Sequence, residues 1–151
     1  MGKESPHEEV SPLTGREAAG RLPGYGPLPR PRSLAEARAV LKQDRFPAPR
    51  VDLVEFEAYE FTAVCPRTGQ PDFGKVRITY VPREWCIESK SLKFYLWAYR
   101  EEGAFCETLA AQIADDIVAA VEPHYVEVVV EQNPRGGIGL KATARRGQPP
   151  A

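Results

Sequence analysis

Hydrophobic and polar residues alternate in four segments of the chain, and this period of two predicts four β-strands. The four segments are 51–64, 75–80, 125–131 and 138–145. In the first segment the apolar phase moves from Val54 and Phe56 to Tyr59 and Phe61. A slip of one residue in the alternation predicts a bulge or bend within that strand.

Between the second and third strands, apolar residues recur at the spacing of a helix face. One helix is predicted from about Ser89 to a break at Gly103, and a second over 105–121. The order β-β-α-α-β-β predicts an α+β fold, an antiparallel four-stranded sheet with two helices on one face. Such a sheet has two open edges, so assembly edge to edge into a ring is expected.

The N-terminal part of the chain differs in composition from the rest. Residues 1–32 are rich in proline, glycine and charge, and such a segment buries little surface. We predict a mobile arm over 1–32 and a single domain over 33–151. Ser33 and Glu36 have the spacing of a capping box, which predicts a short helix that ends before Pro47.

The composition is that of a globular domain and limits the classes of partner. Of the 151 residues, 42% are hydrophobic and 27% are charged, and the net charge is -1. This balance gives no electrostatic footprint for nucleic acid or a membrane surface, so neither is expected as a direct partner. No apolar run has the length of a membrane span or a secretory signal, and a cytoplasmic protein is expected. The three cysteines and two histidines lack the spacing of a disulfide framework or a metal site.

Cys65 begins a loop over 65–74 that proline and glycine residues stiffen. A free cysteine is commonly a small buried hydrophobic residue. At the start of a shaped loop, however, a modest fall in its pKa would make it a nucleophile, and the two interpretations weigh equally. Asp72 follows seven positions later and is either a turn residue or a proton donor to whatever the sulfur attacks.

Lys90 and Lys93 share a face in the first turns of the first predicted helix, where a cation works against the helix dipole. A solvated surface pair is the ordinary interpretation, and a phosphate ligand explains the position better. Arg135, in a Pro-Arg-Gly-Gly turn, is either an exposed turn residue or a third cation for that ligand. Glu107 is either a first-turn carboxylate favoured by the dipole or the anchor of a guanine-like ring.

Four motifs in this order resemble the NADPH-dependent 7-cyano-7-deazaguanine reductases of queuosine biosynthesis, in their short single-module form. The motifs are FTAVCPRTGQPDF (61–73), ESKSLKFY (88–95), FCE (105–107) and NPRGG (133–137). The likeness spans Phe46 to Arg145, and ESKSLKFY is its most specific part. The resemblance implies the tunnelling fold, whose subunits join edge to edge into a barrel, typically a decamer, with active sites between subunits.

The resemblance also implies a reaction and a role for each site residue. A thiolate at Cys65 adds to the nitrile carbon to form a thioimide, and Asp72 supplies a proton. Two molecules of NADPH complete a four-electron reduction to 7-aminomethyl-7-deazaguanine. The implied substrate-binding residues are Ile87, Glu88, Ser89, Cys106 and Glu107, and the implied NADPH-binding residues are Lys90, Lys93 and Arg135.

Two positions depart from the family pattern. Cys106 stands where the family usually has a histidine before the anchoring Glu107, and a thiol cannot replace the hydrogen bonds of an imidazole. Leu109 stands where many members carry a cysteine that forms a protective disulfide with the nucleophile. We hypothesise that Cys106 takes over this pairing with Cys65.

Two other functions are compatible with the sequence. An amidino-type transferase that acts on the same nitrile would keep the pair Cys65 and Asp72, but such relatives lack the lysine-bearing signature found here. A non-catalytic purine- or pterin-binding module would share only the architecture, because a fold does not fix a function.

Overall fold

The computed structural model describes residues 30–151. Most of the predicted N-terminal arm, residues 1–29, therefore lies outside the described residues. At the end of that arm, the guanidinium of Arg30 lies 5.3 Å from the ring centroid of Trp97 and 3.4 Å from the carboxylate of Glu101. The described chain thus starts against the helical layer.

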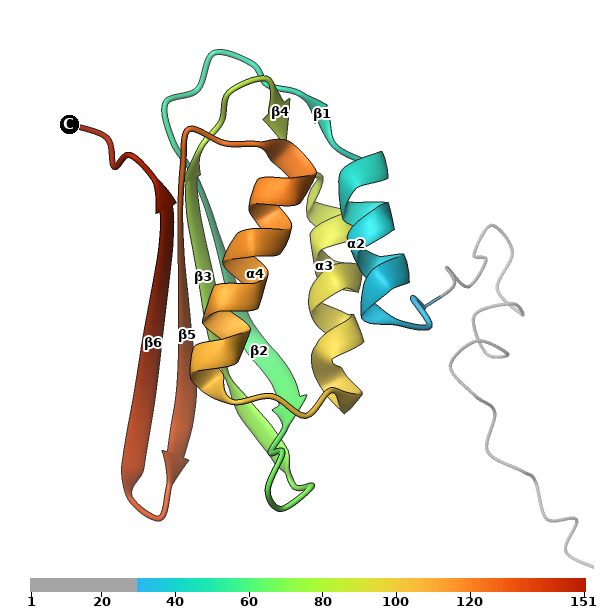
Figure 1. Ribbon diagram of the computed structural model, residues 1–151, viewed down its shortest axis with the longest axis vertical. Coiled ribbons are helices and arrows are strands. Elements are labelled where there is room, and N and C mark those ends of the chain that lie inside the picture. The colour runs from blue at the N-terminus through green and yellow to red at the C-terminus, as the bar shows by residue number, and fades with distance from the viewer. Residues whose placement is uncertain (1–29) are drawn as a thin grey trace, which may run out of the picture.

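The four predicted strands form one antiparallel sheet in the order β2-β3-β5-β6, as Figure 1 shows. Their bounds are β2 (Val54–Val64), β3 (Pro71–Val81), β5 (Tyr125–Arg135) and β6 (Ile138–Gly147). The predicted α+β class and antiparallel four-stranded sheet are confirmed. The edges of this sheet are β2 and β6, and the outer side of β2 is open except at its end, where Val64 makes an isolated parallel bridge to Gly103.

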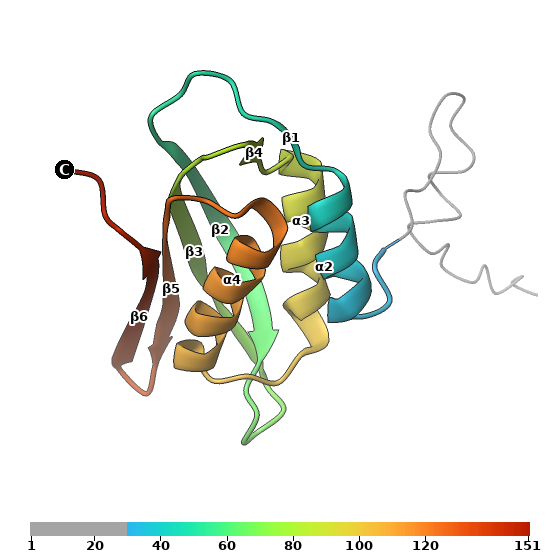
Figure 2. The same cartoon turned by 45° about the horizontal axis from the view of Figure 1, so that its top comes forward.

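The helices lie on one face of the sheet (Figures 1 and 2). They are α2 (Leu34–Gln43), α3 (Ser89–Trp97) continued by the 3-10 turn η1 (Ala98–Glu101), and α4 (Cys106–Val121). The predicted pair is α3 and α4, while α2, the helix predicted from Ser33, packs beside α3. The Ser33 hydroxyl accepts from the Glu36 N–H at 3.1 Å, as the capping box predicts. None of the described helices is long and apolar enough to cross a membrane.

Two strands of two residues each were not predicted, β1 (Phe46–Pro47) and β4 (Trp85–Cys86). They pair only with one another, and no local alternation marks so short a strand. After β4, the backbone N–H of Ile87 donates to the hydroxyl of buried Tyr80 at 2.9 Å. This bond fixes the chain to the sheet just before α3 begins.

The core lies between the helix-facing side of the sheet and α4. Helix α4 packs on β5 and β6, and its buried residues Ile113 and Ile117 belong to one apolar cluster with Val76, Ile78 and Tyr80 of β3. Burying each large apolar side chain contributes about 1.5–3 kcal/mol to the free energy of unfolding. This apolar core fixes the position of the strand ends, which carry the polar residues described below.

One-residue register shifts interrupt two of the strands. In β2 the shift lies between Ala58 and Phe61, which confirms the predicted bulge. Tyr59, predicted to share the apolar phase of Phe61, is instead 68% exposed because it lies within the shift. In β5 a shift lies between Gln132 and Arg135 and was not predicted.

The loop predicted over 65–74 is shorter in the structure. Strand β3 begins at Pro71, a position that proline tolerates because the first residue of a strand needs no ladder N–H. Gly74 also lies within this strand. A side chain is excluded at this position, because a Cβ there would come within 2.0 Å of the carbonyl oxygen of Glu131. Asp72 is therefore a buried strand residue, and its interpretation as a turn residue is wrong.

Candidate active site

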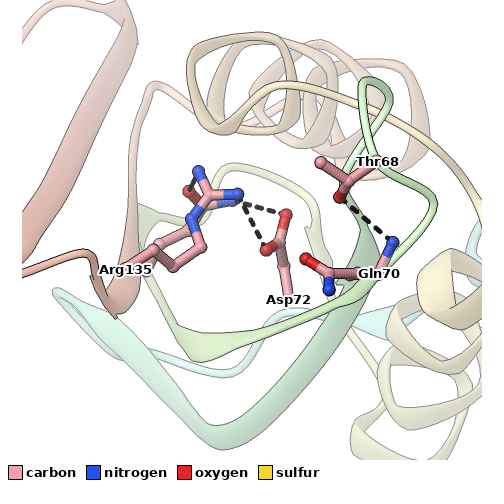
Figure 3. Close-up of polar contacts among 5 residues, drawn as sticks. Thr68, Gln70, Asp72 and Arg135 are labelled. Atoms are coloured by element: carbon pink, nitrogen blue, oxygen red, sulfur yellow. Dashed lines mark hydrogen bonds and ion pairs between the residues drawn. The ribbon is translucent and has the colours of Figure 1, made fainter.

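Cys65 follows the last residue of β2 and begins a closed turn. Its backbone N–H donates to the carbonyl of Gln70, and its own carbonyl accepts from the N–H of Gly69, both at 2.9 Å. Gly69 has a positive φ of 72°, a conformation that glycine adopts without strain. Within the turn, the hydroxyl of Thr68 accepts from the N–H of Gln70 at 3.3 Å, as Figure 3 shows.

The half-buried sulfur of Cys65 has a lowered pKa. The hydroxyl of Thr68 donates to it, the backbone N–H groups of Arg67 and Thr68 add further hydrogen bonds, and the guanidinium of Arg135 contributes another. Together these donors outweigh partial desolvation and lower the pKa of Cys65 to about 7. A large fraction of the thiol is therefore ionised at neutral pH, as a nucleophile requires.

Asp72 and Arg135 form an ion pair beside this turn (Figure 3). The Nη1 of Arg135 lies 2.9 Å from the Oδ1 of Asp72, whose side chain is only 5% exposed. Both residues line an open cleft of about 710 Å³ together with Cys65, Thr68, Gln70, Pro71, Ile138 and Leu140. We call this hollow the Cys65 cleft. It brings Arg135, predicted to bind the cofactor, together with Cys65 and Asp72, which the sequence had already linked.

Gln132 completes this group and was not predicted from the sequence. Its side-chain amide donates to the Oδ2 of Asp72 at 3.5 Å, and its carbonyl oxygen accepts from the Nη2 of Arg135 at 3.0 Å. Gln132 is 6% exposed, so it is one of the few buried polar residues in the described part of the chain. The sequence feature that could have identified it is the alternation along β5. Gln132 lies two residues beyond Val130, on the same face as a row of buried valines.

A second hollow, the β2–α3 groove, lies between the edge strand β2 and helix α3. Its volume is about 870 Å³, and its lining combines aromatic and aliphatic side chains with the cations Lys93 and Arg100, the carboxylates Glu57 and Glu60, and the hydroxyls of Ser89 and Thr62. Lys90 is exposed and is not among the residues that line this groove. The structure thus separates Lys93 from Arg135, although both were predicted to bind one cofactor.

The segment before α3 has clear structural roles. Ile87 is buried, and the carboxylate of Glu88 caps α3 by accepting from the N–H groups of Lys90 and Ser91 at 2.8 and 2.9 Å. Partial burial opposes ionisation of Glu88, but these hydrogen bonds and the charge of Lys90 outweigh it, so the pKa of Glu88 is lowered. Of the three residues predicted here to bind substrate, Ser89 is the one that lines a described hollow.

Cys106 and Glu107 begin helix α4. Cys106 is 1% exposed, and its thiol donates to the carbonyl oxygen of Val130 at 3.4 Å. Burial and the charge of Glu107 raise the pKa of Cys106. Glu107 is exposed, and neither residue is among those that line the two hollows described here.

The family described as QueF-like protein matches residues 71–151 of this chain. A relative from Anaeromyxobacter sp. (strain Fw109-5), named NADPH-dependent 7-cyano-7-deazaguanine reductase, is 51% identical over 70% of this chain and 89% of its own length. The chain belongs to the QueF-like family. A reductase of the same name from Thermomicrobium roseum is 47% identical, over 68% of this chain and 82% of its own length.

A solved structure supports the fold of this QueF-like protein. The apo form of the archaeosine synthase QueF-Like aligns with a TM-score of 0.63 and 27% sequence identity, covering 68% of this chain and all of that chain. The family match begins at Pro71, so Asp72, Gln132 and Arg135 lie within it while Cys65 precedes it. The role of Cys65 therefore depends on the site geometry and on the longer alignments with the reductases.

In this QueF-like protein the predicted Cys65–Cys106 disulfide stays a prediction, since both thiols are free in the structure. To form it, Cys106 has to leave its hydrogen bond with Val130 and lose its proton, which burial disfavours. After mild peroxide treatment we expect a Cys65–Cys106 peptide link in non-reducing mass spectrometry. Oxidation of Cys65 to sulfinic acid with Cys106 unmodified would contradict the pairing.

Proposed function

We propose that this protein is the NADPH-dependent reductase that converts the nitrile of 7-cyano-7-deazaguanine to the aminomethyl group in queuosine biosynthesis. The observation that carries the proposal is the Cys65 cleft, where a thiol with a lowered pKa lies with an aspartate and an arginine. Relatives of 51% and 47% identity that bear the reductase name support the same assignment.

The chemistry proposed for the cleft begins at the sulfur. The Cys65 sulfur adds to the nitrile carbon as a thiolate, the ion-paired Asp72 carboxylate takes up the proton that the thiol releases and passes it to the nitrile nitrogen, and a covalent thioimide results. NADPH, when bound, supplies the hydride for each of the two reduction steps. Between them the thiolate leaves, and the protein has to hold the imine away from water until a second hydride arrives.

The β2–α3 groove fits the cofactor better than the Cys65 cleft does. A dinucleotide needs cations for its phosphates and an apolar wall for its rings. In the groove Lys93 lies with Trp97 and Leu96, whereas Arg135 is engaged with Asp72 in the other hollow. We therefore assign Lys93 to NADPH within one subunit, with Lys90 beside it on the same helix, and place Arg135 with the reacting groups.

We further propose that subunits assemble edge to edge, with β2 of one chain beside β6 of the next. The two edge strands make this pairing available, and assembly would bring the hollows of different subunits together. Glu107 and Ser89, both exposed in one chain, would then complete the substrate site. A cytoplasmic location, with no direct nucleic-acid or membrane partner, belongs to this proposal.

The reductase assignment is tested by incubating the protein with 7-cyano-7-deazaguanine and NADPH. We expect loss of NADPH absorbance, two NADPH for each amine formed, and a gain in intact mass equal to the nitrile when NADPH is omitted. An adduct without NADPH oxidation would support the transferase alternative. Binding of the substrate with neither adduct nor oxidation would support the purine-binding module.

Replacing both Lys90 and Lys93 by alanine is expected to raise the KM for NADPH by about tenfold or more for each lysine that binds a phosphate. Formation of the thioimide, which needs no cofactor, is expected to proceed as in the unmodified protein. The single variant Lys93→Ala should account for most of the effect because Lys93 lines the groove.

The matched control for the lysine pair is Lys42→Ala, an exposed lysine in the last turn of α2. It should leave the KM for NADPH unchanged. If the double variant keeps the same KM as the control, the two lysines belong to the solvated surface and not to the cofactor site.

A further inference from the structure

The backbone at the end of β5 has an irregularity with a direct consequence for the Cys65 cleft. Residues three apart in a regular strand point to opposite faces, so Gln132 and Arg135 should diverge. The register shift between them reverses the phase of Arg135. As a result, the Arg135 guanidinium turns back to lie within 3.0 Å of the Gln132 side-chain oxygen.

Gln132 reaches Asp72 from the neighbouring strand. It lies opposite Gly74 in the ladder between β5 and β3, and Gly74 is two residues from Asp72 on the same face. The absence of a side chain at Gly74 lets the β5 backbone approach, because a Cβ there would lie 3.1 Å from the Cα of Gln132. The amide nitrogen of Gln132 is thus brought to 3.5 Å from Asp72.

The three side chains therefore form a closed ring of contacts. Asp72 binds Arg135, Arg135 binds Gln132, and Gln132 binds Asp72. Gln132 is buried, whereas the side chain of Arg135 is 52% exposed and has freedom to move without it. Of the residues that line the cleft, Asp72 and Arg135 carry the charges, and both also act on the pKa of the buried Cys106 thiol.

We propose that Gln132 is a positioning residue of this site, which holds the Arg135 guanidinium and the Asp72 carboxylate in place beside the sulfur of Cys65. Gln132 touches no reacting atom and acts through the two charged residues. A glutamine suits this task because it offers a donor to the carboxylate and an acceptor to the guanidinium without adding charge. The inference deepens the proposed function by placing Arg135 in the reacting cleft.

The test uses Gln132→Met, which keeps the length of the side chain and removes both hydrogen bonds. Full-length protein is alkylated with iodoacetamide across a pH series, and the modification of Cys65 is followed by peptide mass spectrometry. In the unmodified protein we expect alkylation of Cys65 to reach half of its maximal rate near pH 7. In Gln132→Met this midpoint should rise by a few tenths of a pH unit, because Arg135 contributes less to the lowered pKa of Cys65 than Thr68 and the backbone of Arg67 do.

Gln112→Met is the matched control, because Gln112 is a half-buried glutamine on α4 outside the residues that line the cleft. Its midpoint should equal that of the unmodified protein. Should Gln132→Met fail to fold, Arg135→Met provides the measurement, since its half-exposed side chain can be replaced without opening the core. It is expected to show the same rise. An unchanged Cys65 midpoint in the variant measured overturns the proposal.

A second measurement separates a positioning role from simple packing. NADPH oxidation with the cyano substrate is compared in Gln132→Met, Asp72→Asn and the double variant. If Gln132 acts through Asp72, its replacement should slow turnover by about tenfold or more alone and by less than about threefold when Asp72 is already replaced. Equal reductions in both backgrounds overturn the proposal.

The alkylation series needs no substrate, so its outcome is independent of the proposed reaction. A shifted midpoint in a protein that never captures the nitrile would support the role of Gln132 and reject the reductase assignment. A protein that reduces the nitrile and shows no shift would support the assignment and reject the role of Gln132.

Discussion

Replacement of Cys65 by alanine is expected to abolish the mass gain with 7-cyano-7-deazaguanine and to lower NADPH oxidation by at least about 10³-fold. The reason is that a nitrile accepts hydride poorly, and only its sulfur adduct presents a C=N bond that a protonated group can activate. No other thiol can take over, because Cys86 and Cys106 are buried and outside the residues that line the cleft.

The Cys65→Ala protein should keep its fold. The backbone hydrogen bonds that close the turn, from Cys65 to Gln70 and from Gly69 to Cys65, do not involve the sulfur. Its circular dichroism and thermal midpoint should therefore match those of the unmodified protein. Cys86→Ala serves as the control for removal of a thiol elsewhere and should still gain the mass of the nitrile. A covalent adduct on the Cys65→Ala protein would remove the basis of the proposed mechanism.

The ionisation of Cys65 is expected to make the rate of adduct formation depend on pH. Because the pKa of Cys65 is lowered to about 7, the rate of adduct formation should be small below that pH, where the thiol is protonated, and should level off above it. The hydrogen bond from the Thr68 hydroxyl lowers the pKa of Cys65 more than any other contact does. Thr68→Val should therefore shift the pH dependence of adduct formation upward, toward the ordinary pKa of a thiol.

The main strands and helices could be predicted because the apolar residues of each recur at a regular spacing on the side that faces the core. The row Val76, Ile78 and Tyr80 is apolar throughout, and its register is fixed by the cost of turning it to solvent. The predicted loop over 65–74 was too long, and the turn interpretation of Asp72 was wrong, because Pro71 and Gly74 are typical turn residues in sequence. In the structure Pro71 starts a strand and Gly74 admits a neighbouring backbone, and both are long-range effects.

The composition of the site could be predicted only in part for the same reason. Cys65, Asp72 and Arg135 belong to recognisable motifs, but their contact depends on the register shift in β5, which no local pattern shows. Gln132 follows Glu131, the last residue of the predicted strand, and neither an element nor a role was predicted for it. A buried polar residue that continues an apolar row is the sign that would have found it.

Replacement of Asp72 by asparagine is expected to slow NADPH oxidation by about 10²–10⁴-fold, the range for loss of a positioned proton donor. Asparagine keeps the shape of the side chain, but its amide has no proton to give in the pH range of the reaction. It also breaks the ion pair of 2.9 Å with Arg135. Because Arg135 is 52% exposed, its charge can turn to water, and stability should fall by only ~1 kcal/mol or less.

The control for Asp72→Asn is Asp115→Asn, the same change at an aspartate that pairs with Arg146 on the surface at 2.7 Å. It should retain full turnover with a similar change in thermal midpoint. Turnover of the Asp72→Asn protein within a few-fold of this control would show that the nitrile nitrogen takes its proton from another source. Slow adduct formation together with slow oxidation would place Asp72 at the sulfur addition as well as at the hydride steps, as its position in the Cys65 cleft leads us to expect.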